Sequence, residues 1–522
     1  MKRTLRFFAA AIWLSAAWAQ PSSSLEERIA RIMSRPEFLH ARFGMEFVAL
    51  DRDEVIYRFN EQEFFVAAST TKLLTEGTAL SLLGPDYRFR TRVYRTGAID
   101  ASGTLKGDLI LVAAGDPNLS NRIQADGTLA FQNQDHAYDS MPGGAKLVAG
   151  DPLAVLRELA AQVAKAGIKK IAGHVLVDIS LFPEGERELG TGLVISPVAV
   201  NDNLIDVTII SAVEGSTPQL TLSPATAYVQ IANQLKTGSQ SNKTPDISFT
   251  ERRRPDGGFS VSVQGTVPSG SSLMRTYRVP EPSRFAQMTF VEALKDAGVT
   301  AKADLTLPGP DIHARNFYKP ENQVAEHVSP PFAEEARVTL KVSQNLHASM
   351  TPYVLGAALG KGGDDALQSG FDLERQFLTK AGLDISGASQ SDGAGGEAFF
   401  TPDFMVHYLI YLSHRDAVFP AFLRALPVMG KDGTLWDIQA DSPAAGHVYA
   451  KTGTLGGSDL LHRSLMLTGK GIAGYIDRKD GRRLAFAAYL GMVDGDPETV
   501  IHKVGNVMGE IAAAAYDAGP EP

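Results

Sequence analysis

The spacing of apolar and polar residues predicts a mixed fold of helices and strands at both ends of the chain. The apolar positions of residues 73–83 fall on one stripe of a helix, which ends at Gly84-Pro85. Just before it, residues 43–50 and 55–59 have the pattern of a β-hairpin. Strand-like segments return later in the chain, at 447–452, 472–477 and 484–490. We expect strands from both ends to share one sheet in an α+β domain.

The pattern changes between residues 93 and 319, where short strand-like segments are frequent. The expected strands lie at 105–114, 174–178, 193–200, 204–211, 226–232 and 259–266. The expected helices lie at 151–167 and 284–297, and the expected polar loops at 117–150 and 236–258. We therefore expect residues 93–319 to form one or two mostly β domains. This stretch would be inserted into a discontinuous domain made of residues 20–92 and 320–522.

The first 19 residues have the pattern of a signal peptide. Three basic residues among the first six precede an apolar run at 7–17, and Ala17-Trp18-Ala19 matches a cleavage site. A membrane-spanning helix needs about 20 apolar residues, so this run is too short to be an anchor. We expect an exported protein whose mature chain has no transmembrane segment.

The composition limits the cellular compartment in which the protein works and the molecules that it binds. The 522 residues have a net charge of −9, which gives no electrostatic footprint for nucleic acid. There is no cysteine, which excludes disulfides, thiolate metal sites and a cysteine nucleophile. An exported protein without disulfides fits the periplasm or cell envelope of a bacterium. The sequence does not define an oligomeric state.

Ser69 and Lys72, at the start of the first predicted helix, are the first candidates for chemistry. Residues three apart on a helix share a face, with Cβ atoms about 5–6 Å apart. Burial lowers the pKa of a lysine, and a neutral amine beside a hydroxyl can take its proton. The alternative is a helix-capping serine with a solvated lysine. This is the only Ser-x-x-Lys in the chain.

Ser343 and Asn345 are a second candidate pair, directly after a helix expected at 331–341. A hydroxyl and a carboxamide two residues apart can relay a proton and hold a substrate amide. Taken alone, such a tripeptide is more often a turn or a helix cap.

The segment Lys451-Thr-Gly-Thr454 is a third candidate, at the end of the strand expected at 447–452. Strand alternation places Lys451 and Gly453 on one face of the sheet. Thr452 and Thr454 fall on the opposite face. A lysine and two hydroxyls at a sheet edge suit a carboxylate, and a glycine removes a Cβ where a substrate backbone approaches. The alternative is an edge strand that uses lysine against aggregation.

Two other segments imitate functional motifs. Lys236-Thr237-Gly238 repeats the third pattern inside the insertion, and we expect it to be a loop. Glu186 to Gly190 is similar to the deacylating glutamate loop of class A β-lactamases. It lacks the final asparagine and precedes Ser343, so we expect it to take no part.

Ser-x-x-Lys, Ser-x-Asn and Lys-Thr-Gly together are the signature set of penicillin-recognising serine enzymes. Further segments extend the resemblance to the low-molecular-mass class C penicillin-binding proteins, which are D-alanyl-D-alanine carboxypeptidases/endopeptidases of the bacterial envelope. These segments are Leu83–Thr91, Gly107–Val112, Gly115–Pro117, Asn201–Asn203, Ser329–Pro331, Asp392–Gly395, Asp432–Leu435 and Ala450–Leu455. The long insertion between the first two motifs is also typical of this family, and β-lactamases lack it.

The resemblance implies a penicillin-binding-protein/β-lactamase-like fold, with an antiparallel sheet covered by helices on both faces. It also implies cleavage of D-Ala-D-Ala termini or D-Ala-containing cross-links of peptidoglycan through an acyl-enzyme. Ser69 would be the nucleophile and Lys72 its general base. Ser343 would relay the proton to the leaving amine, and Asn345 would hold the acyl-side amide.

The resemblance assigns the third motif to the carboxylate end of the substrate. Lys451 would supply positive charge, and Thr452 and Thr454, around Gly453, would bind the terminal carboxylate. The backbone N–H groups of Ser69 and Thr454 would form the oxyanion hole. Peptidoglycan stem peptides are the implied substrates and β-lactams the implied covalent inhibitors. No metal or organic cofactor is implied.

The sequence also departs from this family. Gln344 and His347 stand where aspartate and tyrosine are frequent, and Gly396-Glu397 replaces a usual Leu-Ser-Arg. Two alternatives therefore stay open beside the peptidase. One is a β-lactamase or esterase on the same scaffold, and the other is a non-catalytic cell-wall binding protein.

Overall fold

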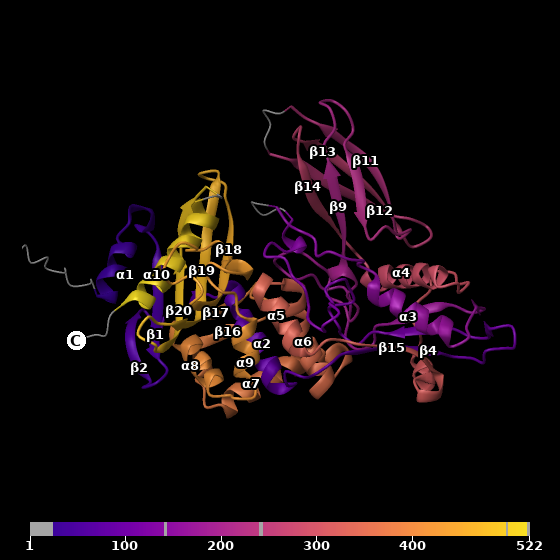
Figure 1. The fold of residues 1–522 in the computed structure, drawn as a ribbon, viewed down its shortest axis with the longest axis horizontal. Coiled ribbons are helices and arrows are strands. Elements are labelled where there is room, and N and C mark those ends of the chain that lie inside the picture. The colour runs from indigo at the N-terminus through magenta and orange to yellow at the C-terminus, as the bar shows by residue number, and fades with distance from the viewer. Residues whose placement is uncertain (1–23, 140–143, 240–243, 497–498, 519–522) are drawn as a thin grey trace, which may run out of the picture.

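One antiparallel sheet joins the two ends of the chain (Figure 1). The computed structural model describes residues 24–139, 144–239, 244–496 and 499–518, so the signal peptide expected at 1–19 lies outside the described residues. The strand order is β18-β19-β20-β1-β2, and β21 pairs with β19. The bounds are β1 (Arg42–Ala49), β2 (Glu54–Phe59), β18 (Val448–Asp459), β19 (Ser464–Asp477), β20 (Arg483–Gly491) and β21 (Val493–Gly495). Because β1 pairs with both β2 and β20, the early hairpin completes a sheet whose other strands come from the end of the chain.

Helices cover both faces of this sheet. On one face, α1 (Leu25–Met33) and α10 (Val504–Asp517) enclose a buried apolar core that includes Phe47. A second core, which includes Leu73, lies on the other face. The helices there are α2 (Thr71–Leu82), α5 (Phe332–Val342), α6 (Asn345–Leu359), α7 (Ala366–Lys380), α8 (Pro402–Ser413) and α9 (Phe419–Ala425). The predicted antiparallel α+β architecture is therefore confirmed. In the described part of the chain, no helix is long and apolar enough to cross a bilayer.

Helix α2 is enclosed on all sides, whereas the sequence predicts a single apolar stripe. Residues 71–80 are all buried, since α2 packs against α5 and α6 and also touches β18. Several of its polar side chains have hydrogen-bond partners from distant segments. Thr75 Oγ1, for example, donates a hydrogen bond to the carbonyl oxygen of Gly393 at 2.8 Å. The helix that carries the candidate nucleophile is thus held from every side.

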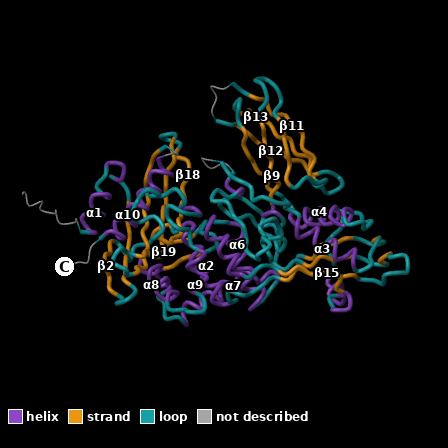
Figure 2. Tube along the Cα trace, viewed as in Figure 1, coloured by secondary structure: helices purple, strands orange, loops and turns teal. Residues whose placement is uncertain are grey.

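The segment between β4 and β15 forms the second half of the molecule. A four-stranded sheet of order β15-β4-β6-β8 shares a core with α3 (Ala154–Lys165) and α4 (Pro282–Asp296). Its strands are β4 (Arg90–Arg95), β6 (Leu109–Val112), β8 (Val175–Asp178) and β15 (Gln323–Val328). Beyond it lie the strands of two further sheets, β10-β9-β14 and β11-β13-β12 (Figure 2). These two sheets share a small core that includes Val207 and Leu235. These strands are β9 (Leu204–Ile210), β10 (Gln219–Ser223), β11 (Val229–Thr237), β12 (Asp246–Arg253), β13 (Phe259–Val267) and β14 (Ser272–Arg278).

Short strands complete the connections. β3 (Phe65–Val66), β16 (Ala388–Gln390) and β17 (Ala398–Phe400) form a small antiparallel sheet next to the nucleophile helix. β5 (Thr104–Leu105) and β7 (Lys170–Ile171) pair in parallel.

Four expectations for the insertion are wrong. Residues 193–200 form only isolated bridges, and residues 236–258 contain strand β12 rather than only a loop. Lys236 and Thr237 are the last residues of β11, so the repeated Lys-Thr-Gly begins in a strand. The expected surface loop at 117–150 is buried at 117–120 and 135–137, because some of its polar side chains find charged partners from distant segments. Hydrophobic periodicity does not detect burial of that kind.

Candidate active site

Ser69 lies on a strained turn at the start of α2. A 3₁₀ turn, Ala68–Thr70, leads into the helix, and Ala68 has a positive φ of 45°. Such backbone persists only where the surroundings determine it. The loop at Gly395 supplies part of that constraint, because a Cβ on Gly395 would lie 1.9 Å from the carbonyl oxygen of Ala68. The position of the serine is therefore fixed by a loop some 320 residues away in the sequence.

Lys72 is the centre of the site. Its Nζ lies 2.7 Å from Ser69 Oγ and 2.6 Å from Asn345 Oδ1. The same atom lies 3.3 Å from Ser343 Oγ and 3.2 Å from the carbonyl oxygen of Ala394. Burial lowers the pKa of Lys72 to about 7, although nearby carboxylates, Glu188 first, act to raise it. A lysine with this pKa can supply a neutral amine to Ser69 near neutral pH.

The second motif lies in the turn between α5 and α6. Ser343 ends α5 in the left-handed conformation, with φ at 62°, and Gln344 caps α6 by accepting a hydrogen bond from the N–H of Leu346 at 3.1 Å. This sharp turn brings both Ser343 and Asn345 to Lys72. The hydroxyl of Tyr138 donates to the carbonyl oxygen of Ser343, so the insertion touches the turn directly.

The third motif lies on strand β18, next to the nucleophile turn. Lys451 and Gly453 are buried, whereas Thr452 and Thr454 are more exposed, as strand alternation predicts. A Cβ on Gly453 would lie 2.6 Å from the carbonyl oxygen of Ala67 and 3.1 Å from the backbone nitrogen of Ser69. Glycine is therefore required for β18 to approach the turn.

The Lys451 and Thr452 side chains of the third motif form hydrogen bonds within the protein. Lys451 Nζ donates to the carbonyl oxygen of Thr452 at 2.6 Å. Thr452 Oγ1 lies 3.0 Å from Thr434 Oγ1. Burial, together with the charges of Lys72 and Lys470, lowers the pKa of Lys451 well below its usual value. An incoming carboxylate would favour the charged ammonium again.

Lys470 is a site residue that the sequence analysis missed. Its Nζ donates to Thr454 Oγ1 at 2.7 Å, and burial lowers its pKa to about 8. Lys470 pairs with Thr454 across strands β18 and β19. The predicted strand begins at residue 472 and the observed strand β19 at residue 464, so the prediction leaves Lys470 outside the strand. A longer hairpin in the prediction would have revealed it.

The segment from Glu186 to Gly190, which we expect to take no part in the reaction, nevertheless lies beside the site. A Cβ on Gly190 would lie 1.9 Å from Asn345 Nδ2. The Glu188 carboxylate accepts hydrogen bonds from the N–H groups of Gly190 at 2.7 Å and Leu193 at 3.3 Å. The Glu188 carboxylate is thus hydrogen-bonded to backbone N–H groups of its own loop. The part of this loop that lies against the Asn345 side chain is the backbone at Gly190.

Metal-ligating side chains lie outside the Ser69–Lys72 site. Within the described residues, three groups bring carboxylate and imidazole atoms within 4.8 Å of one another. They are Glu46, Asp403 and His407; Asp135, His136 and Asp202; and Asp459, His462 and Asp494. In the buried second group, the guanidinium of Arg122 binds both aspartates and takes the place that a metal cation would need.

We expect Gly453→Ala to reduce acylation of the protein by a β-lactam by about 10²-fold, since the new methyl group would force β18 away from the nucleophile turn. Gly457→Ala is a matched control on the same strand, because nothing lies within 4 Å of a Cβ there. Stopped-flow acylation rates of the two variants test this. Equal rates in both would show that the approach at Gly453 is unimportant.

We also expect the protein to lose stability between pH 7 and pH 10 through His347. Its Nε2 lies 2.9 Å from Asp202 Oδ1 and its Nδ1 3.0 Å from Glu335 Oε1. Burial alone would lower the pKa of His347, but these carboxylates raise it to about 10. The stabilisation is complete below the unfolded pKa of about 6.5 and is lost as the pH rises towards 10.

The expected loss is on the order of a few kcal/mol in the free energy of unfolding. Urea unfolding at pH 7 and pH 10 measures it, with His347→Gln as the comparison. The variant cannot titrate at this position, so its loss should be smaller. An equal loss in both proteins would contradict the assignment.

Comparisons with known proteins agree with this geometry. Residues 25–510 match the D-Ala-D-Ala carboxypeptidase 3 (S13) family. A D-alanyl-D-alanine carboxypeptidase of an Actinomadura species is 27% identical over 489 residues, which cover 89% of this chain and 80% of that protein. The D-alanyl-D-alanine carboxypeptidase DacB of Haemophilus influenzae is 24% identical over 475 residues, or 86% of this chain and 85% of that protein.

A solved structure shares the fold. Penicillin binding protein 4 of Haemophilus influenzae, in complex with a β-lactam, has a TM-score of 0.69 at 21% identity and covers 93% of this chain and 98% of its own. The family match spans nearly all of the described chain, including all three motifs. The chain therefore belongs to the D-Ala-D-Ala carboxypeptidase S13 family of low-molecular-mass class C penicillin-binding proteins and is a serine DD-peptidase that acts on peptidoglycan.

Proposed function

We propose that the chain hydrolyses D-Ala-D-Ala peptides through an acyl-enzyme on Ser69. The observation that carries this proposal is the convergence on Lys72, whose Nζ contacts Ser69 Oγ at 2.7 Å and Ser343 Oγ at 3.3 Å. In this proposal, neutral Lys72 takes the proton of Ser69 as Oγ attacks the carbonyl carbon of the penultimate D-Ala. Ser343 then passes a proton to the nitrogen of the leaving D-Ala. Water completes the reaction by releasing the acyl group from Ser69.

For the remaining groups we propose the roles that the family resemblance implies. Asn345 holds the amide on the acyl side, and the N–H groups of Ser69 and Thr454 receive the negative charge of the tetrahedral intermediate. One such donor is typically worth about 3–4 kcal/mol in the transition state. Lys451 and Thr452, with Thr454, bind the terminal carboxylate. Lys470 supports this function because it donates to Thr454 Oγ1 at 2.7 Å.

The proposal extends to inhibitors and location. β-Lactams imitate the D-Ala-D-Ala bond and would acylate Ser69 without a D-Ala leaving group. The solved relative named above holds a β-lactam, which supports this expectation.

We also propose export to the periplasm after removal of residues 1–19. Residues 20–92 and 320–522 would form the catalytic domain and residues 93–319 the inserted part, although strands β4 and β15 of the inserted sheet extend past both boundaries.

A pentapeptide that ends in D-Ala-D-Ala tests the proposed function. We expect one equivalent of D-Ala for each peptide cleaved, and slow turnover of a penicillin that labels the protein stoichiometrically. Fast penicillin hydrolysis without release of D-Ala would favour a β-lactamase. No labelling by any β-lactam would favour a cell-wall binding protein. Cross-linked dimers of stem peptides in the same assay measure the endopeptidase activity.

A further inference from the structure

A buried turn of the insertion lies directly against the second motif. Asn201, Asp202 and Asn203 are all buried, and all three have left-handed backbone, with φ values of 49°, 54° and 56°. Left-handed conformations are unfavourable for residues with a Cβ, and asparagine and aspartate tolerate them best. Three in a row persist only where the surroundings determine them, which points to a function for this turn.

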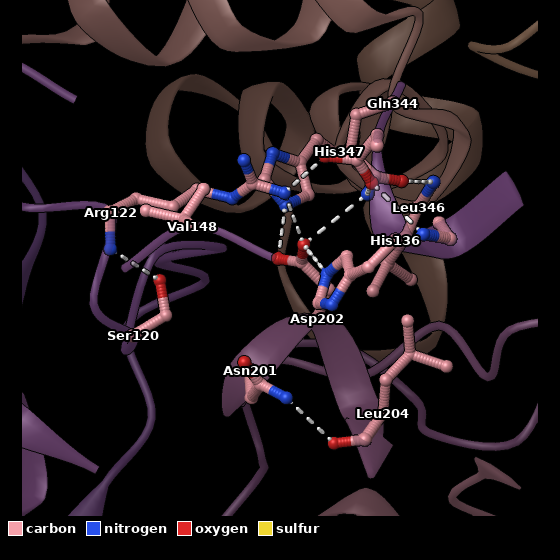
Figure 3. Close-up of polar contacts among 12 residues, drawn as sticks. Ser120, Arg122, His136, Val148, Asn201, Asp202, Leu204, Gln344, Leu346 and His347 are labelled. Atoms are coloured by element: carbon pink, nitrogen blue, oxygen red, sulfur yellow. Dashed lines mark hydrogen bonds and ion pairs between the residues drawn. The ribbon is translucent and has the colours of Figure 1, made fainter. Parts of the chain in front are cut away.

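Asp202 is the side chain that this turn presents to the rest of the molecule (Figure 3). From the insertion, Arg122 Nη2 and His136 Nε2 each lie 2.7 Å from its Oδ2. From the other side, Gln344 Nε2 lies 3.3 Å from the same oxygen, and His347 Nε2 lies 2.9 Å from Oδ1. Four donors from three segments therefore meet on one carboxylate, which can accept about four hydrogen bonds.

Two of these donors flank Asn345 in the sequence. Gln344 stands between Ser343 and Asn345, and its side chain is held at both ends. Its Nε2 also lies 3.2 Å from Asp135 Oδ1, and its Oε1 accepts the N–H of Leu346 at 3.1 Å. The turn that carries the second motif is thus bonded to aspartates of the insertion.

The geometry leads us to propose that Asp202 is a positioning residue for this turn. Through Gln344 and His347, it holds Ser343 and Asn345 at their distances from Lys72, and the inserted part of the chain is thereby required for acylation. The proposal rests on the proposed function of Ser343 and Asn345. It concerns this chain's own residues, since Gln344 and His347 are two of the positions at which the sequence departs from its family.

Acylation should depend on this support because a small displacement of Ser343 from Lys72 is enough to break their contact. Ser343 Oγ lies 3.3 Å from Lys72 Nζ, at the long end of a hydrogen bond. A displacement of about 1 Å would break this contact and can reduce a rate by about 10²-fold. The turn itself has strained backbone at Ser343, so it needs outside support to keep this shape.

The test compares Asp202→Asn with Asp206→Asn. Asparagine keeps the shape of Asp202 but loses its charge and half of its acceptor capacity. Asp206 is a matched control in the same cluster, equally buried. In the described part of the chain, its hydrogen bonds go to His136 at 2.8 Å and Asn201 at 3.0 Å, and not to the second motif.

The readout is acylation by a fluorescent penicillin, with binding and acylation constants separated and rates given per folded molecule. We expect the acylation constant of Asp202→Asn to fall by about 10- to 100-fold. Its noncovalent binding constant should stay within about threefold, because Asp202 is buried and its side chain is bonded to other protein groups. Asp206→Asn should acylate within about threefold of the wild type, with a comparable fall in unfolding temperature. A merely structural role would lower the unfolding temperature of both and slow neither folded protein.

A second variant covers the case in which Asp202→Asn does not fold. Gln344→Met keeps a similar volume but removes the hydrogen bonds of Gln344 to Asp202, Asp135 and Leu346, and should also slow acylation by at least about 10-fold. The double variant should be slowed by less than the product of the two single effects, since both variants break the contact between Gln344 and Asp202. Wild-type acylation rates in Asp202→Asn and Gln344→Met, or an equal fall in Asp206→Asn, would overturn the proposal. If the wild type is not labelled at all, the proposed function fails first, and this inference fails with it.

Discussion

Ser69→Ala should abolish covalent labelling by a fluorescent penicillin and reduce the release of D-Ala by at least about 10⁴-fold. The reason is that Ser69 Oγ lies 2.7 Å from Lys72 Nζ, and the backbone of Ser69 lies beside strand β18 at Gly453. Without a nucleophile, the remaining groups can bind a peptide and polarise its carbonyl group but cannot form an acyl-enzyme. Gel fluorescence and a D-Ala assay measure both effects.

Ser81→Ala is the control for this experiment. Ser81 lies on the same helix, and its Oγ donates to the carbonyl oxygen of Gly77 at 2.7 Å, away from Lys72. This variant should label like the wild type. Labelling that survives in Ser69→Ala and disappears in Ser343→Ala would move the nucleophile to the second motif.

Lys72→Met should slow acylation by about 10²- to 10⁴-fold, which is the usual contribution of a general base. Methionine fills the buried space of the lysine without an amine. Burial lowers the pKa of Lys72 to about 7, and the base is the neutral form. In the wild type, acylation should therefore rise with pH and level off above an apparent pKa near 7. Rapid-mixing measurements between pH 5 and pH 9 give this profile.

Lys72→Arg distinguishes the role of Lys72 as a general base from the effect of its positive charge. A guanidinium keeps the positive charge but does not lose its proton at these pH values. We expect it to acylate as slowly as Lys72→Met, without the rise near pH 7. A fast Lys72→Arg variant, or a wild-type profile that does not change around pH 7, would show that another group accepts the proton.

The three motifs could be predicted from the sequence because each is a local pattern. Ser69 and Lys72 lie one helical turn apart, and Lys451 and Gly453 alternate on a strand, so local geometry alone places each pair. The sheet was also predictable in outline, since its strands have clear apolar patterns at both ends of the chain.

The groups that support the motifs could not be predicted, because each depends on a distant partner. Tyr138 lies in a polar stretch that seemed to be a surface loop, yet its hydroxyl reaches the carbonyl oxygen of Ser343. Asp202 is a polar residue in an apolar context, and its burial makes sense only with Arg122 and His347 beside it. Buried polar groups need partners, and a single sequence does not say which residues meet.

The most direct test of the central claim is a crystal structure of the protein after reaction with a penicillin. The acyl group should be bonded to Ser69 Oγ, with its carbonyl oxygen about 3 Å from the N–H groups of Ser69 and Thr454. The penicillin carboxylate should contact Thr452 or Thr454, and Lys72 and Ser343 should border the ester. An adduct on another residue, or a carboxylate bound away from β18, would contradict the account.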